Sequence, residues 1–195
     1  MNNNKKKKYS NKRRYRKKKY KKLTKEEALI PLPLNTKWVL WCHLKTERNW
    51  DISTFIKVYT ISTVQNFWGV YNNIRFDDQI FFLMREGISP IWNTPKNKDG
   101  GKWNIYVNRK KVSEIWRDLS LLAIGETLKC KGKPINGIAI RPKFAQSIIK
   151  IMTSKKENKN HWYREYNQYE LNKIFNKDTQ FRFESHIDTV KRMQS

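Results

Sequence analysis

Cysteine is scarce in this sequence. Cys42 and Cys130 are the only two cysteines in 195 residues, and they match neither a metal-ligand pattern nor a disulfide framework. So little cysteine fits a reducing compartment. A signal peptide and an apolar run long enough to span a bilayer are lacking too. We therefore expect a cytoplasmic protein, with the nucleus as a second location, and no membrane association.

Acidic residues are also few. The chain has 17 Asp and Glu against 42 Lys and Arg, which gives a formal net charge of +25. This balance predicts a polyanionic partner. Nucleic acid is favoured over a membrane surface because no amphipathic or acylation signal accompanies the charge.

The first 22 residues are almost entirely Asn, Lys, Arg, Tyr and Ser, and they contain no acid. Such a composition lacks the apolar residues that a core needs, so we predict a disordered basic tail over residues 1–22. The tail could be a solvated extension, a nuclear-localisation signal or a non-specific RNA-binding arm, and composition leaves these open. Residues 23–195 are predicted to form one domain.

The residue patterns of common catalytic sites are missing. The sequence has no Gly-rich phosphate loop, no cluster of metal ligands and no array of carboxylates. His43, His161 and His186 are scattered, and we expect each to be structural. The sequence therefore predicts a binding protein that is not an enzyme and that needs no metal or cofactor.

Tryptophan, by contrast, is abundant, with eight residues. Pro90 and Pro95 bracket Trp92, which places this indole on a loop. Trp50 follows a polar run between two strand-like segments. A single loop Trp is more often folded over the core, but two of them in a basic chain favour platforms that stack on a flat ligand.

Hydrophobic periodicity predicts an α+β domain. A mostly antiparallel, strongly curved sheet should carry all its helices on one face and the loops with Trp50, Trp92 and residues 141–143 on the other. Thr63 is a candidate helix cap. The pattern predicts strands over 37–44, 55–61, 80–85, 103–107, 138–141, 148–153 and 180–184, and helices from 63, over 112–122 and over 160–175.

Seven segments follow one another between about residues 32 and 190. They are Leu-Pro-Leu at 32–34 with Trp38 and Trp41, Thr-Val-Gln-Asn-Phe-Trp at 63–68, Gly-Ile-Ser-Pro-Ile-Trp at 87–92, Lys-Asn-Lys-Asp-Gly-Gly-Lys-Trp at 96–103, Ile-Gly-Glu at 124–126, Arg-Pro-Lys at 141–143, and Ser-His-Ile-Asp-Thr at 185–189. In this order they resemble the eukaryotic translation initiation factor 4E family, the mRNA cap-binding proteins. The resemblance implies a curved sheet of about eight strands, backed by three helices on its convex face, with a cap slot on the concave side.

In this resemblance Trp50 and Trp92 are the two stacking indoles. N7 methylation makes guanine cationic, so each indole gains a cation–π contribution in addition to ordinary stacking. Asn93 stands where the family usually has a Glu that accepts from guanine N1 and N2, which predicts weaker guanine discrimination than in the family. Met152 takes the place of a Trp that approaches the cap methyl group.

The resemblance also implies which residues bind the cap phosphates. Arg141 and Lys143 would hold the cap phosphates, and Gln146 or Lys150 would replace a further basic residue because this loop is longer. Arg192 lies near a basic position that contacts the second nucleotide, although solvated surface charge is the plainer interpretation there.

On the opposite surface the resemblance implies a docking groove for a short helix of the Tyr-x-x-x-x-Leu-apolar kind. The alternative is that Trp68 belongs to the core, since its helical spacing suits burial. Arg117 replaces a usually apolar residue. The groove residues are Pro33, Val64, Trp68, Arg117, Asp118, Leu121 and Ile124.

We therefore expect a monomer that binds capped mRNA and recruits a scaffold factor for translation initiation. A cap-binding repressor and a general single-stranded RNA-binding module in which the tail dominates are the alternatives.

Overall fold

The computed structural model describes residues 24, 26, 29–130, 133–155, 168–175 and 179–189. The chain divides into two units, residues 1–30 and 31–195. The predicted basic tail, Arg192 and residues 160–167 of the last predicted helix lie outside the described residues.

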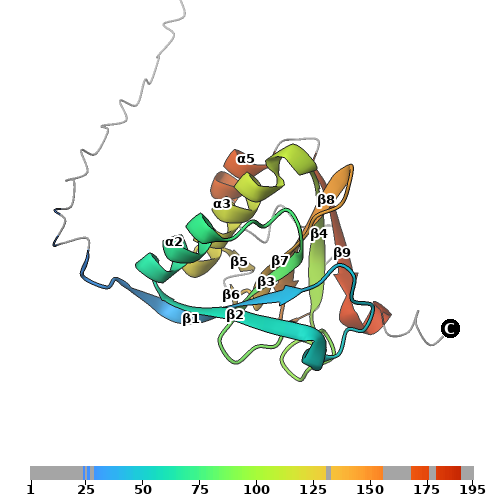
Figure 1. Ribbon diagram of the computed structural model, residues 1–195. Helices are drawn as coiled ribbons and strands as arrows, with labels where there is room; N and C mark the ends of the chain where they lie inside the picture. The colour runs from blue at the N-terminus through green and yellow to red at the C-terminus, as the bar shows by residue number, and fades with distance from the viewer. Residues whose placement is uncertain are drawn as a thin grey trace, which may run out of the picture. The chain divides into compact units, whose positions relative to one another are not determined.

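Seven strands form one antiparallel sheet in the order β2-β1-β3-β7-β8-β4-β9. Figure 1 shows the sheet bending across β1 and β2. The prediction of a curved antiparallel sheet is confirmed, with seven strands where about eight were expected. The strands are β1 (Pro33–His43), β2 (Phe55–Thr63), β3 (Ile80–Arg85), β4 (Gly101–Asn108), β7 (Gly137–Arg141), β8 (Gln146–Thr153) and β9 (Gln180–Ser185).

Two short strands that the sequence did not predict, β5 (Lys129–Cys130) and β6 (Lys133–Pro134), pair with each other in a separate two-stranded sheet. Two 3₁₀ turns, η1 (Ile52–Thr54) and η2 (Arg109–Lys111), end the connections before β2 and before the second helix.

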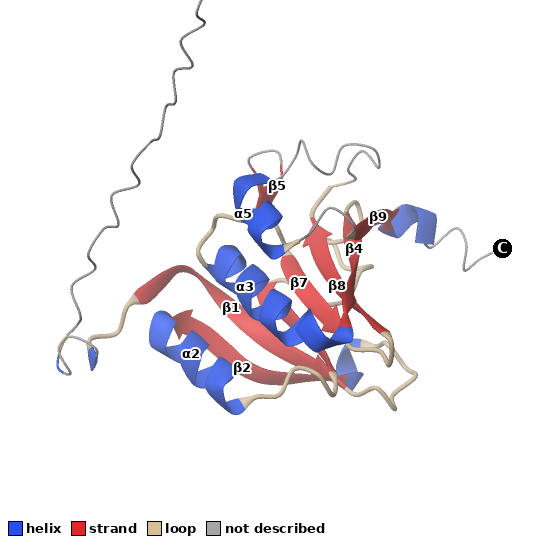
Figure 2. Ribbon diagram, turned by 90° about the horizontal axis from the view of Figure 1, so that it is seen from above, coloured by secondary structure: helices blue, strands red, loops and turns tan. Residues whose placement is uncertain are grey.

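The helices α2 (Val64–Asn73), α3 (Val112–Ile124) and α5 (Gln168–Ile174) lie on one face of the sheet, as predicted (Figures 1 and 2). A further helical turn over residues 186–189, directly after β9, does not follow the prediction that all helices share this face, because His186 and Thr189 line a cavity on the other one. Thr63 caps α2 by accepting a hydrogen bond from the Asn66 amide at 3.0 Å. The Tyr71 hydroxyl donates to Ser120 Oγ and so ties α2 to α3. No helix of the described residues is long and apolar enough to cross a membrane.

Side chains alternate along β4, as expected for a strand that covers a core on one face. Trp103, Ile105 and Val107 are buried in the same cluster as residues of all three helices. Lys102 and Tyr106 lie on the other face and are half-buried.

A smaller apolar cluster without any helix residue lies on that other face. β3 serves both clusters, because Phe81 and Leu83 join the main core while Phe82 and Met84 join the smaller one. Its first five residues are therefore all buried. The smaller cluster consists of Phe55, Ile80, Phe82, Met84, Ala139 and Met152.

One ion pair ties β3 to the turn after α3. The Arg85 guanidinium donates to both carboxylate oxygens of Glu126 and, at 2.7 Å, to the Ile135 carbonyl. It also lies 4.7 Å from the Trp38 ring centre. The contact with Arg85 holds the pKa of the Glu126 carboxyl below its usual range, against the opposing effect of burial.

Replacing Glu126 with Gln should therefore lower the free energy of unfolding at neutral pH by about 1.5 to 3 kcal/mol, the usual contribution of a hydrogen bond to a charged group. Because the folded-state pKa of Glu126 is lowered, the parent protein should lose this contribution as the pH falls through that pKa. The two stability curves should then converge in acid. Urea unfolding followed by Trp fluorescence measures both effects. The exposed Glu86→Gln is the matched control, and an equal loss in both variants would contradict the assignment.

Candidate functional site

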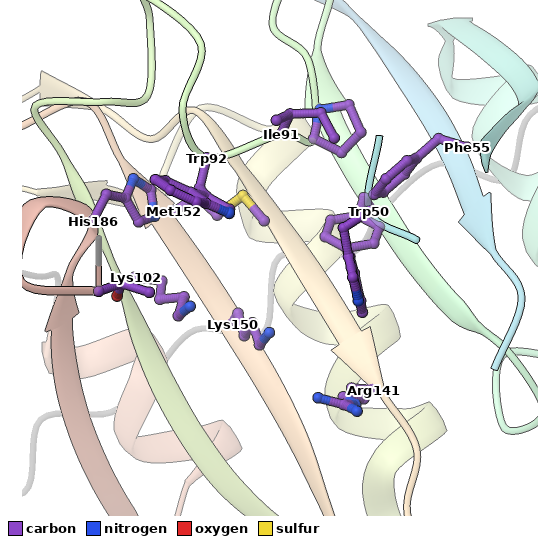
Figure 3. A pocket seen from close by; sticks show the side chains of 12 residues that line it. Trp50, Phe55, Ile91, Trp92, Lys102, Arg141, Lys150, Met152 and His186 are labelled. Atoms are coloured by element: carbon purple, nitrogen blue, oxygen red, sulfur yellow. The ribbon is translucent and has the colours of Figure 1, made fainter. Parts of the chain in front are cut away.

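A cavity of about 300 Å³ opens on the face of the sheet that carries the smaller apolar cluster. Figure 3 shows Trp50 and Trp92 on different sides of it, with three cationic side chains in a row beside them. It is lined by Trp50, Phe55, Phe82, Pro90, Ile91, Trp92, Lys102, Arg141, Lys150, Met152, His186 and Thr189.

The Trp50 indole is supported on one face by the last residue of β1. The His43 ring stacks on it with centroids 4.1 Å apart and an interplanar angle of 9°. His43 Nε2 in turn donates to the Asn49 carbonyl at 2.8 Å, and Thr54 Oγ1 donates to the same oxygen at 3.0 Å. Trp50 is 40% exposed, so it is no part of the core. One face is covered by His43, and the other is available to a ligand.

The loop that carries Trp92 is fixed by one buried amide. Asn97 is fully buried, and its Nδ2 donates to the carbonyl oxygens of Ser89 at 2.8 Å and Ile91 at 2.7 Å. Its Oδ1 accepts from Asn136 Nδ2 at 2.8 Å. All these groups are satisfied by fixed partners, so the loop has a defined shape although it contains no regular secondary structure.

Two positions in this loop have a backbone geometry that requires glycine. A Cβ on Gly100 would lie 1.9 Å from the Thr153 carbonyl oxygen, so only glycine permits this approach to β8. Gly87, where the loop begins, has a φ of +75°, which a side chain would strain.

His186 closes the cavity beside Trp92. Its Nδ1 donates to the Asn97 carbonyl at 2.8 Å, and its ring centre lies 6.4 Å from that of Trp92. Burial lowers the pKa of His186, with the Asn97 hydrogen bond opposing. The imidazole is therefore neutral at physiological pH. It lies beside Trp92 without adding charge to the cavity.

Three cations line the cavity: Lys102 on β4, Lys150 on β8 and Arg141 at the end of β7. Burial, together with repulsion from Lys102 and Arg141, lowers the pKa of Lys150 to about 7, although Glu184 acts in the other direction. Glu184 pairs with Lys102 at 3.3 Å and is not a lining residue.

Carboxylates are missing from the lining residues. The site thus combines aromatic and apolar walls with cations along one side. Such a site suits a flat aromatic ligand with an anionic extension, because the rings stack on the flat part while the cations neutralise the extension.

The structure brings together five of the residues that the sequence analysis selected, namely Trp50, Trp92, Arg141, Lys150 and Met152. Met152 contributes to the apolar floor. Asn93, Lys143 and Gln146 are exposed and do not line the cavity.

The sequence analysis missed Lys102 and Asn97, and it expected a structural role for His43 without identifying Trp50 as the residue that His43 supports. Lys102 could have been found, since Trp103 is a core residue and alternation places its neighbour on the other face. His186 was expected only as a structural residue, yet it lines the cavity. No sequence signal identifies His43 or Asn97, because their partners are set by loop geometry.

The opposite surface has a second concavity. Trp68 on α2 is 40% exposed, so burial in the core does not explain this residue. A cleft of about 510 Å³ is lined by Trp68 and Tyr71 on α2, Ser113, Glu114 and Arg117 on α3, and Asn72, Ile74, Arg75, Phe76 and Asp77.

The other predicted groove residues do not line this cleft. Val64 and Leu121 are half-buried, and Pro33 is exposed on β1. Asp118 is half-buried and pairs with Arg117 at 2.9 Å. Ile124 is only 6% exposed and belongs to the main core, which leaves little of it for a partner.

Within the described part of the chain, no group of three or more His, Cys, Asp or Glu side chains is arranged to hold a metal ion.

A model of the family described as eukaryotic initiation factor 4E matches residues 33–195. Eukaryotic translation initiation factor 4E of Candida albicans is 34% identical over 130 residues, which is 60% of this chain and 62% of that relative. The match thus spans less than two thirds of the relative's length.

Solved structures agree. Caenorhabditis elegans eIF4E-3, in a complex with the 4E-binding protein Mextli and a cap analog, superposes with a TM-score of 0.71 at 26% identity, covering 83% of this chain and 96% of that one. Ascaris suum eIF4E-3 with m7G cap gives 0.68 at 25% identity, covering 80% and 92%. The chain therefore belongs to the eukaryotic initiation factor 4E family.

Proposed function

We propose that this protein binds the 7-methylguanosine cap at the 5′ end of mRNA in the cavity between Trp50 and Trp92. The observation that carries the proposal is that two loop indoles and three cations line one cavity, whose described lining residues include no carboxylate. The methylated base would stack against the free face of Trp50 and against Trp92. The phosphates would extend along Lys102, Lys150 and Arg141.

The guanine edge would be held less tightly than the base faces. Asn93 is exposed and lies outside the lining residues, so it offers no charge-assisted acceptor inside the cavity. Affinity would rest mainly on stacking, the cation–π contribution of the N7-methylated ring and the phosphates. We therefore propose a strong requirement for methylation and weaker discrimination of the guanine edge.

We further propose that a scaffold initiation factor docks a short helix at Trp68 and the cleft between α2 and α3, and that this complex acts in the cytoplasm to start translation. The family is one of cap-binding proteins, and we propose binding without catalysis. A solved structure holds C. elegans eIF4E-3 in a complex with the 4E-binding protein Mextli, which supports a partner surface. Recovery of a scaffold factor with the capped complex would favour initiation over repression.

Trp50→Ala and Trp92→Ala should each weaken binding of 7-methylguanosine triphosphate by about 1 to 3 kcal/mol, the usual contribution of one stacked base. Calorimetric titration measures this. Trp68→Ala is a matched control because Trp68 and Trp50 are both 40% exposed. If the cavity variants bound the ligand like the parent protein, the cap would not lie between these indoles.

The affinity for the same ligand should depend on Lys150. Because its pKa is lowered to about 7, Lys150 is charged below that pH and becomes neutral above it in the free protein. A bound phosphate raises this pKa, so binding takes up a proton and affinity falls as the pH rises above about 7. Ionisation of the ligand contributes equally to the pH profiles of all variants. The difference between the profiles of the parent protein and Lys150→Met therefore reports the ionisation of Lys150.

Titrations from about pH 6 to pH 9 in buffers of different ionisation enthalpy measure this proton uptake. Lys150→Met should flatten the pH profile, whereas Lys57→Met, which removes an exposed charge outside the lining residues, should retain the slope. An unchanged slope in Lys150→Met would contradict the proposed coupling.

Trp68→Ala should weaken binding of a peptide of the Tyr-x-x-x-x-Leu-apolar type by about 2 kcal/mol or more, as is common for truncated interface anchors. Cap affinity should be retained because the cavity and the cleft share no lining residue. Fluorescence anisotropy of a labelled peptide measures the effect, with Trp50→Ala as the reciprocal control. Undiminished peptide binding would place the partner elsewhere.

A further inference from the structure

Phe144 lies in the loop that joins β7 to β8, and its side chain is 96% exposed. No other large hydrophobic side chain in the described residues is as exposed. Single exposed apolar residues are common on proteins and need no explanation by themselves. This one is distinguished by where the loop begins, because Arg141, the last residue of β7, lines the cavity.

The loop is held at its base, although the phenyl ring is in solvent. Arg109 donates to the Lys143 carbonyl at 3.1 Å, and the Lys143 amide donates to Ser147 Oγ at 3.4 Å. Ser147 is fully buried in β8. The backbone on the N-terminal side of Phe144 is thus tied to two neighbouring segments, which presents the ring on a supported loop.

Strand register gives the direction from the cavity to this loop. Lys150 pairs with Ala139, and Ile148 pairs with Arg141, so the row of cations runs diagonally from β4 across β8 to the end of β7. Figure 3 shows Arg141 at the end of this row that is farther from Trp92. Phe144 follows Arg141 by three residues, and three extended residues span at most about 10 Å.

The same register places Tyr106, Ile148 and Arg141 in one row across β4, β8 and β7. Tyr106 and Ile148 are half-buried on the face that carries the cavity. An apolar strip beside a guanidinium therefore continues the site from its cations toward the loop. A ligand longer than a single nucleotide would meet this strip and then Phe144.

We propose that Phe144 stacks on the base of the first nucleotide that follows the cap across its phosphate bridge. The proposal rests on the proposed cap-binding function. Arg141 and Lys143 flank the bridge and supply the positive charge that an RNA backbone needs. A phenyl ring stacks on the face of any base, so this subsite would add affinity without strong preference for one base.

The test compares 7-methylguanosine triphosphate with the dinucleotide in which an adenosine is attached to the same triphosphate, by calorimetric titration. Phe144→Ala should lower affinity for the dinucleotide about fivefold or more, the effect of losing one base–aromatic stack. It should leave affinity for the mononucleotide unchanged. Phe144→Leu should behave like Phe144→Ala, and Phe144→Trp should bind the dinucleotide at least as tightly as the parent protein.

Ile56→Ala removes another exposed apolar side chain, 51% exposed on β2, and should change neither affinity. Equal losses for both ligands in Phe144→Ala would overturn the proposal, because the ring would then only support the phosphate contacts. Full dinucleotide affinity in Phe144→Leu or Phe144→Ala would also overturn it. So would a Phe144→Ala variant that keeps its affinity for the dinucleotide but loses its affinity for the Tyr-x-x-x-x-Leu-apolar peptide. Failure of the parent protein to bind the mononucleotide would instead refute the proposed function itself.

Discussion

The alternation of side chains across one antiparallel sheet is the constraint on which both surfaces depend. Each strand sends every second residue toward the helices and the intervening residues to the other face. Because the helix-facing residues of β4 and β8 fill the main core, Lys102 and Lys150 are forced onto the open face. The cations of the site are thus placed by the same periodicity that builds the hydrophobic core.

The two indoles are placed in a different way. Trp50 depends on a stacked His43, and Trp92 depends on a loop organised around the buried Asn97 amide. Asn97 also accepts from His186 through its carbonyl, so the same residue joins the loop to the segment after β9. Rigid aromatic platforms lose little entropy when a ligand binds, which makes this support part of the binding site.

The electrostatics of the cavity oppose the stability of the free protein. Lys150 is half-buried between Lys102 and Arg141, and the lowered pKa of Lys150 reports the cost of desolvation and like-charge repulsion there. An anionic ligand would relieve this repulsion. Glu184 relieves part of it without entering the cavity, by pairing with Lys102.

The sequence by itself determined most of the regular elements, including β3 and the start of α3, because hydrophobic periodicity and capping are local signals. It also placed Trp50, Trp92 and Arg141 on one face and α2, α3 and α5 on the other, but not the helical turn over residues 186–189, which lies beside the cavity. Tertiary structure alone decided the strand order, the exposure of Asn93 outside the cavity, and the roles of His43, Asn97 and His186. Those features depend on which distant segments come into contact in the folded chain. Antiparallel strand pairing and loop hydrogen bonds decide those contacts, whereas a local sequence pattern shows only the hydrophobic period of its own segment.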